Sequence, residues 1–324
     1  MTLWKLSAGT ASVIGIKRIK SAALPRTAYI MLGETCRNHC SFCSQAAGSQ
    51  GKRDFLSRIS WHECSAREAV PPLAQAYAEG GIKRICLQVV DGENTRETTL
   101  EALKQLQAGG IGAICVSRNL QTAGQVHELL ASGAEKICIA MDAAAPDIYR
   151  RVKVDSWESK WKLLMECARL FPGRISTHLI IGLGETEEQA VEFIADCTQR
   201  GITVGLFAFT PLAGTPLAAA QPPAIGQYRR VQIAHFLLRK GYEREVIRCA
   251  GGRIVDIAVP GICSLLLDGS AFETTGCPDC NRPYYNERPG GTMYNYPRPL
   301  TAAETEQAIG ESGLGGEQRG LAYY

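Results

Sequence analysis

The feature that most constrains the fold of this chain is a regular alternation of short apolar segments with longer helical ones. The apolar segments are continuous rather than alternating, which is typical of parallel strands buried on both faces. Glycines end several of the intervening helical segments, as at Gly80, Gly133 and Gly201. The strands predicted in this way cover residues 28–32, 84–90, 113–117, 136–141, 175–181, 203–209, 245–250 and 262–267.

Eight strand–helix units within roughly 240 residues predict a (β/α)8 barrel of the TIM type. An open, doubly wound sheet is the alternative, but no Gly-x-Gly-x-x-Gly sequence follows the first strand. We therefore expect an α/β barrel over residues 25–270, preceded by an N-terminal extension over residues 1–24. A C-terminal cysteine-containing cap loop over residues 271–300 and a flexible tail over residues 301–324 would follow the barrel.

Composition narrows the classes of function. The 324 residues include 13 cysteines and carry a net charge of +3, which gives no reason to expect a nucleic acid or an anionic membrane as partner. No apolar run reaches the length of a membrane span, and residues 11–16 are too short for the apolar core of a secretion signal. We therefore expect a cytoplasmic protein whose cysteines serve metal binding or redox chemistry rather than disulfides.

Three cysteines stand close together directly after the first predicted strand. Cys36, Cys40 and Cys43 have the spacing Cys-x3-Cys-x2-Cys, and a barrel carries its reactive residues in the loops that follow its strands. Three thiolates on one loop can bind three irons of a [4Fe–4S] cluster, which leaves the fourth iron open to a small molecule. The alternative is a zinc knuckle or a set of buried structural thiols, but zinc usually takes four ligands and no nearby fourth ligand fits as well.

This motif resembles that of the radical S-adenosylmethionine (SAM) superfamily, in which SAM binds the open iron and yields a 5′-deoxyadenosyl radical. Gly182-Leu-Gly-Glu-Thr186 after the fifth predicted strand adds to the resemblance, although alone it reads equally well as a turn with a helix cap. The residues alone also allow Asp142 to cap a helix and Arg151 to lie on a solvated face. The resemblance implies a catalytic cluster on Cys36, Cys40 and Cys43. It implies SAM-binding roles for Phe42, Gln88, Ser117, Asp142, Arg151 and Ile180.

Three successive predicted strands repeat an Ile-Cys pair, at Cys86, Cys115 and Cys138. A buried cysteine is often just a small hydrophobic residue, so packing is an equally good reading of these pairs. The order of elements from 82 to 217 nevertheless resembles biotin synthase, in which the cysteines matching Cys86 and Cys115 hold a second cluster inside the barrel. Ser176 stands where that family has a third cysteine, and Arg248 where it has an arginine ligand.

A further pair, Cys277 and Cys280, forms a Cys-Pro-Asp-Cys sequence near the carboxyl end. Because the pair follows the eighth predicted strand, we expect it over the mouth of the barrel. It would there ligate an auxiliary [4Fe–4S] cluster together with Cys86 and Cys115. A zinc half-site or a redox dithiol is the alternative.

Residues 277–291 resemble the biotin-synthase-like proteins that form the split, two-protein lipoyl synthases. The resemblance implies radical insertion of sulfur from the auxiliary cluster into an octanoyl group on a lipoyl carrier protein, at carbon 6 or carbon 8. It implies two partners besides that carrier: a second radical SAM lipoyl synthase subunit, and a low-potential electron donor such as ferredoxin or flavodoxin. The alternatives are a biotin-synthase-like enzyme acting on a small molecule, a methylthiotransferase, or an iron–sulfur carrier without catalytic activity.

Overall fold

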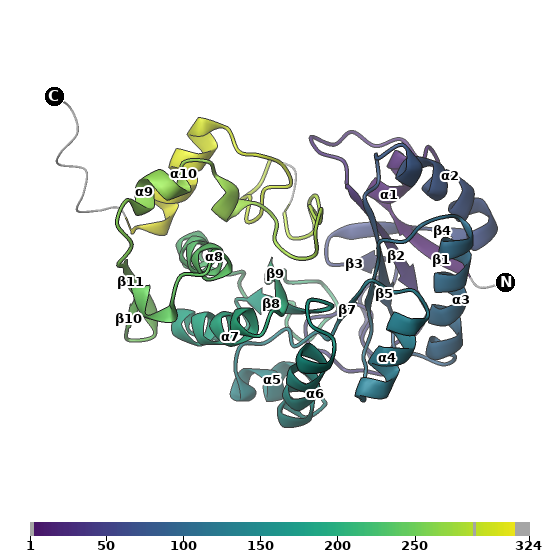
Figure 1. Ribbon diagram of the computed structural model, residues 1–324, viewed down its shortest axis with the longest axis horizontal. Coiled ribbons are helices and arrows are strands. Elements are labelled where there is room, and N and C mark those ends of the chain that lie inside the picture. Colours follow the sequence, from purple (N-terminus) through teal and green to yellow (C-terminus); the bar gives the residue numbers. More distant parts are fainter. Residues whose placement is uncertain (1–2, 288–289, 315–324) are drawn as a thin grey trace.

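Six consecutive parallel strands make up one end of a nine-stranded sheet in the computed structural model, which describes residues 3–287 and 290–314 (Figure 1). The order of the sheet is β3-β4-β1-β2-β5-β6-β7-β8-β9. Its parallel strands are β2 (Thr27–Leu32), β5 (Arg84–Val89), β6 (Ile114–Ser117), β7 (Lys136–Cys138), β8 (Ile175–Ile181) and β9 (Thr203–Ala208). The predicted α/β fold with parallel strands is therefore confirmed, although the sheet does not close into a barrel.

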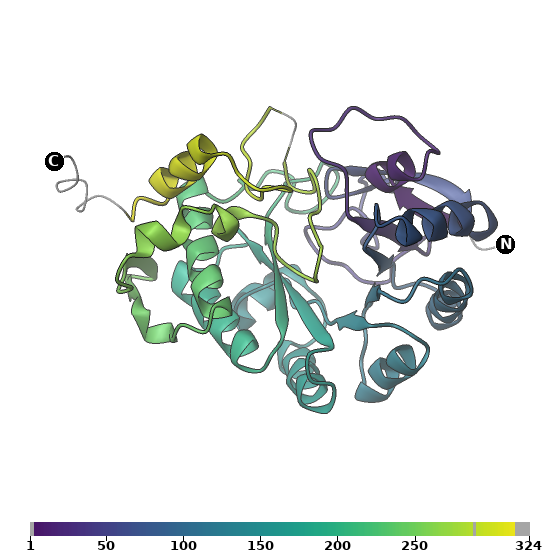
Figure 2. The ribbon, with the colours of Figure 1, turned by 45° about the horizontal axis from the view of Figure 1, so that its top comes forward.

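Helices that follow strands of this sheet along the chain cover one side of it (Figure 2). They are α2 (Ala66–Ala78), α3 (Thr95–Ala108), α4 (Ala123–Ala131), α5 (Pro146–Val152), α6 (Trp157–Leu170), α7 (Glu187–Gln199) and α8 (Ile225–Arg239). The predicted cap of α7 is confirmed, because the Thr186 and Gln189 side chains bond each other's backbone N–H groups in a capping box. In the described residues, no helix combines the length and apolar character that crossing a membrane requires.

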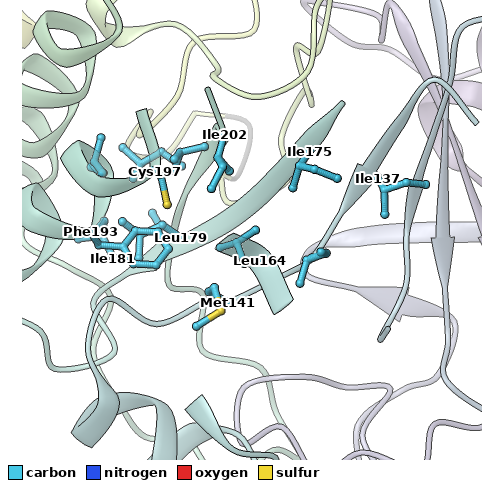
Figure 3. Close-up of a cluster of buried hydrophobic side chains, with 14 of the residues drawn as sticks. Ile137, Met141, Leu164, Ile175, Leu179, Ile181, Phe193, Cys197 and Ile202 are labelled. Carbon is cyan, nitrogen blue, oxygen red and sulfur yellow. The ribbon is translucent and has the colours of Figure 1, made fainter. Parts of the chain in front are cut away.

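The main hydrophobic core lies between the sheet and these helices. Leu179 and Ile181 of β8 gather there with Leu164 of α6 and with Phe193 and Cys197 of α7 (Figure 3). Each of these side chains is at most 5% exposed, and burying one large apolar side chain contributes about 1.5–3 kcal/mol. This packing holds the ends of the parallel strands in place.

The prediction of a seventh and an eighth barrel strand is wrong. Residues Ile247–Ala250 form β10, which pairs only with β11 (Arg253–Ile257) in a separate antiparallel hairpin. The two residues between these strands, Gly251 and Gly252, both have positive φ, as a tight hairpin turn requires. The segment predicted as the eighth strand instead begins with the short helix α9 (Ile262–Leu266).

The amino-terminal residues, expected to be an extension, add strands to the sheet. β1 (Leu3–Ser7) lies between β2 and β4 (Ile59–Ser65) and is antiparallel to both. Trp4 and Leu6 are buried, but two apolar residues in so short a strand are a weak sequence signal. The connection after the cysteine motif likewise contains β3 (Phe55–Leu56) and β4, and α1 (Ala8–Val13) follows β1.

The carboxyl-terminal part of the chain crosses back over the molecule, between α8 and the amino-terminal strands (Figures 1 and 2). After the 3-10 turns η1 (Arg244–Val246) and η2 (Ser270–Phe272) it runs along the outer edge of β9 and then reaches α10 (Ala302–Ser312). The expected flexible tail is thus helical over α10, which Arg229 of α8 anchors through Glu311 at 2.8 Å. Residues 315–324 of that predicted tail lie outside the described residues.

Candidate active site

The three motif cysteines lie at the carboxyl ends of the parallel strands, where they line a cavity of about 290 Å³. The loop that carries them is held to the end of β5, because the Arg37 N–H donates to the Asp91 carbonyl oxygen and the Asn38 amide donates to the Asp91 carboxylate. Burial raises the pKa of Cys40 to about 11 and that of Cys43 to about 12. Iron binds thiolates, so loading this loop must release protons.

Most of the side chains predicted to bind SAM line the same cavity. They are Phe42, Gln88, Ser117, Asp142 and Ile180. Arg151 is not among the residues of the cavity wall: it is exposed, and its guanidinium lies against Gly184. The structure thus brings five of the six together, while the role of each stays a prediction.

Lys153, for which the sequence predicted no role, lines the cavity. Its ammonium group lies 2.7 Å from the Asp142 carboxylate and donates to the Ala140 carbonyl oxygen at 3.1 Å. Burial opposes the charge on Lys153, but Asp142 and the nearby Cys40 outweigh it and raise the pKa of Lys153. The sequence gives no sign of this inward position, because two exposed arginines, Arg150 and Arg151, precede Lys153 with only Val152 between them.

A second lysine extends this charged side of the cavity. Lys160 of α6 lies 3.1 Å from the Asp155 carboxylate and donates to the Asn119 side-chain oxygen at 2.6 Å. Asn119 in turn donates to Asp91, which holds the cysteine loop. Hydrogen bonds therefore connect Lys160 of α6, through Asn119 and Asp91, to the loop of the three cysteines. The sequence predicted no role for these three residues.

The part of the wall formed by β2, β3 and β9 is mainly apolar. It includes Met31, Leu56, Phe207 and Phe209, with Tyr285 from the carboxyl-terminal segment. His178 of β8 also lines the cavity, its ring packed on Phe207 at 4.9 Å between centroids. Burial lowers the pKa of His178 to about 4. A neutral, apolar surface thus faces the charged groups across the cavity.

Below this cavity, the inward side chains of the parallel strands enclose a space that we call the lumen. In β5, Ile85 and Leu87 belong to the core under the helices, whereas Cys86 packs with the separate cluster around Tyr29 and Tyr285. Strand alternation places Cys115 of β6 beside Cys86, its cross-strand partner. Cys86 and Cys115 therefore both face the lumen, as expected.

Cys277 and Cys280 also face the lumen, but from the end opposite to the one we predicted. The Pro278 carbonyl oxygen accepts from Arg84 at 3.1 Å, and the Asp279 carbonyl oxygen accepts from Thr27 at 3.3 Å. Arg84 and Thr27 are the first residues of their strands. The loop thus covers the amino-terminal ends of the strands and not the mouth, because no eighth strand exists to carry it upward.

The thiols from the strands and from the loop are in contact. Cys115 is hydrogen-bonded to Cys277, which lowers the pKa of Cys277, helped by the charges of Arg84 and Lys136. The Cys280 sulfur lies 3.4 Å from the Tyr29 hydroxyl of β2. The four cysteines that we predicted as auxiliary ligands therefore share one buried space.

An arginine does enter the lumen, but it is Arg282 and not Arg248. Arg282 lies 3.8 Å from the centre of the Phe207 ring and donates to the Leu206 carbonyl oxygen at 3.1 Å. Arg248 is exposed on the β10–β11 hairpin, where it pairs with Asp256 at 3.2 Å. The expectation that Arg248 occupies the position of a cluster ligand is wrong because its strand lies outside the main sheet.

The arrangement of these thiols suits clusters rather than single ions. Within the described residues, no three side chains of Cys, His, Asp or Glu converge to hold one metal ion. In an iron–sulfur cluster each thiolate binds a different iron, so the ligands surround a space instead of meeting at a point. Cys36, Cys40 and Cys43 line the cavity side by side, and the four lumen cysteines lie near one another below it.

Comparison with known proteins agrees with this arrangement. The family model described as the radical SAM superfamily matches residues 30–197, just over half of the chain. The biotin synthase of Mycobacterium tuberculosis (strain ATCC 25618 / H37Rv) is 28% identical over 247 residues, which cover 72% of this chain and 65% of that protein. The biotin synthase of Halorhodospira halophila is 26% identical over 287 residues, which cover 84% of this chain and 83% of that protein. The chain therefore spans just under two thirds of the length of the first of these relatives.

The fold has a counterpart among solved structures. HydG, a maturase of the [FeFe]-hydrogenase, superposes with a TM-score of 0.52 at 11% sequence identity. The match covers 71% of this chain and 52% of that chain. At such an identity the likeness concerns the fold alone.

Proposed function

The chain belongs to the radical SAM superfamily, and from this premise we propose that it inserts sulfur into an unactivated carbon chain. Membership implies a [4Fe–4S] cluster and SAM, which Cys36, Cys40 and Cys43 would hold in the cavity. When bound, this pair supplies hydrogen-atom abstraction by a carbon radical, chemistry that side chains cannot perform. The protein's own residues position the reactants and exclude water.

One observation carries the proposal: the structure brings Cys86, Cys115, Cys277 and Cys280 together directly below the cavity of the motif cysteines. An auxiliary [4Fe–4S] cluster on these thiolates would be the sulfur donor and is consumed as a substrate. Phe42, Gln88, Ser117, Asp142 and Ile180 would orient SAM above it. A substrate carbon held between the SAM site and the auxiliary cluster would lose a hydrogen atom on the side of SAM and receive sulfur on the side of the auxiliary cluster.

The substrate that we propose is an octanoyl group on a lysine of a lipoyl carrier protein. The apolar wall around Met31, Phe207 and Phe209 favours an unbranched alkyl chain over a charged molecule. We propose as partners a second radical SAM lipoyl synthase subunit and a ferredoxin or flavodoxin, in the cytoplasm. This chain would add either the first sulfur, at carbon 6, or the second, at carbon 8.

A biotin-synthase-like reaction on a small molecule is the second candidate. The similarity to the biotin synthases of two bacteria favours it. Against this candidate, Ser176 stands where that family has a third cysteine, and Arg248 is exposed on the β10–β11 hairpin.

Mass spectrometry of the product tests the proposal. The anaerobically reconstituted protein, with reductant and SAM, is incubated with an octanoylated carrier protein, with and without the second subunit. Heavy sulfide introduced only into the auxiliary cluster should appear in the carrier. Thiolation of the sulfur-free precursor of biotin, with the carrier unchanged, would instead establish the second candidate. Unlabelled product would refute the lumen cluster as the donor.

A further inference from the structure

Cys138, the third of the repeated Ile-Cys pairs, faces the same lumen as the four proposed ligands. Its neighbours Ile137 and Ile139 are packed in the core under the helices, so strand alternation turns Cys138 to the opposite side. Cys138 is 5% exposed, yet it belongs to neither hydrophobic cluster, and the same holds for Cys115. Both thiols therefore line the lumen and do not fill the core.

The register of the parallel strands shows how far along the sheet Cys138 lies relative to the other thiols. Its cross-strand partner on β8 is Ser176, and its partner on β6 is Ser117. The Cys86–Cys115 pair lies one layer below, because Cys115 is paired with Lys136, two residues before Cys138. Thiols from three adjacent strands thus form one wall of the lumen.

Contacts connect Cys138 to the loop that covers the lumen. The Ser117 and Ser176 side chains lie beside Cys138, and Ser176 also lies beside Cys277. Cys138 is close enough to Cys277 and to Cys86 for a charge on either sulfur to raise its pKa or theirs, so the three side chains are neighbours in the lumen. Three other buried cysteines have no such setting: Cys64, Cys167 and Cys197 are packed in the main hydrophobic core.

We propose that Cys138 is an iron ligand of the lumen cluster, contributed by β7 at the height where β8 carries Ser176. The assignment rests on the proposed auxiliary cluster and extends its ligand set to a third strand. Serine is a far weaker iron ligand than a thiolate, so a thiolate one strand away supplies the sulfur that position 176 lacks. The lumen then offers five thiols, one more than the four irons of a [4Fe–4S] cluster take.

Moving the thiol from position 138 of β7 to position 176 of the neighbouring strand β8 tests this assignment. In a background with Cys36, Cys40 and Cys43 changed to alanine, the lumen site should hold all remaining iron, about four atoms. Cys138→Ser should change the electron paramagnetic resonance spectrum of the reduced cluster and lower the iron that the protein retains on dilution, because the remaining fifth thiol has to replace the lost ligand. The double variant Cys138→Ser/Ser176→Cys should restore both, because the thiol returns to the same height on the neighbouring strand.

The swap separates ligation from packing. A Cys138→Ser protein that merely folds poorly would not be rescued by a second change, whereas a lost ligand would be. Cys167→Ala, which removes a core thiol, is the matched control and should keep its iron. Unchanged iron and spectrum in Cys138→Ser, or loss without recovery in the double variant, would overturn the assignment. If the background itself held no iron, the auxiliary cluster and the proposed function would fall with it.

Discussion

Replacing Thr275 with valine tests how the carboxyl-terminal segment is held in place. β9 is the last strand of the sheet, so the groups on its outer side have no neighbouring strand. The Thr275 hydroxyl accepts a hydrogen bond from the Leu206 N–H at 3.0 Å, and Arg282 donates to the Leu206 carbonyl oxygen. The segment that carries Cys277 and Cys280 thus takes the place of a further strand.

The magnitude follows from the group that is left behind. Valine has nearly the shape of threonine, so the change opens no cavity but leaves the buried Leu206 N–H without an acceptor. An unpaired buried donor costs about 1–3 kcal/mol. That cost shifts the equilibrium between docked and undocked segment about 5- to 150-fold toward the undocked form.

Hydrogen exchange followed by mass spectrometry measures this shift in peptides that contain Leu206 or Cys277. Thr275→Val should speed exchange in both, and the auxiliary iron retained on dilution should fall. Thr99→Val is the matched control: it removes a buried hydroxyl that only donates to the Thr95 carbonyl oxygen of α3. Equal exchange in Thr275→Val and the parent would refute the view that this bond holds the segment.

Three further predictions concern the charged cavity wall, a core histidine and the motif loop. Asp142→Asn should lower the free energy of unfolding in urea by about 3–5 kcal/mol, because it leaves the buried Lys153 unpaired. When the pH falls from 7 to 5, the His235→Leu variant should lose about 2 kcal/mol less of its free energy of unfolding than the parent protein. Burial lowers the pKa of His235 to about 3, so the unfolded chain takes up its proton first as the pH falls. Cys40→Ala should abolish reductive cleavage of SAM to 5′-deoxyadenosine and leave about half of the eight irons.

Each of these predictions has a control and a contradicting result. Asp256→Asn breaks an exposed pair with Arg248 and should cost less than about 1 kcal/mol; an equal loss in both variants would contradict the buried role of Asp142. A His235→Leu protein with the parent's pH profile would show that other groups cause the acid loss. Retained SAM cleavage in Cys40→Ala would remove the motif loop from the catalytic site.

Local patterns in the sequence were enough for much of the site. The three motif cysteines are close in the chain, so any fold of their loop brings them together, and Cys86 and Cys115 turn inward by the two-residue period of a strand. The α7 cap likewise depends on only four consecutive residues. The six parallel strands were predictable because burial on both faces leaves mainly apolar residues in most of them, although β8 also contains Ser176, Thr177 and His178.

Contacts between distant parts of the chain decided the rest. Strand β1 is defined by its pairing with β2 and β4, and the hairpin of β10 and β11 takes Arg248 away from the lumen. Cys277 and Cys280 reach the amino-terminal end of the strands because Arg84 and Thr27 bind their loop and because β9 needs partners along its open edge. Such pairings join residues as many as 252 positions apart, and in each bond of this loop one of the two partners is a backbone group, which every residue carries. The sequence pattern therefore predicts that Cys86 and Cys115 point inward, but it does not predict at which end of the sheet Cys277 and Cys280 lie.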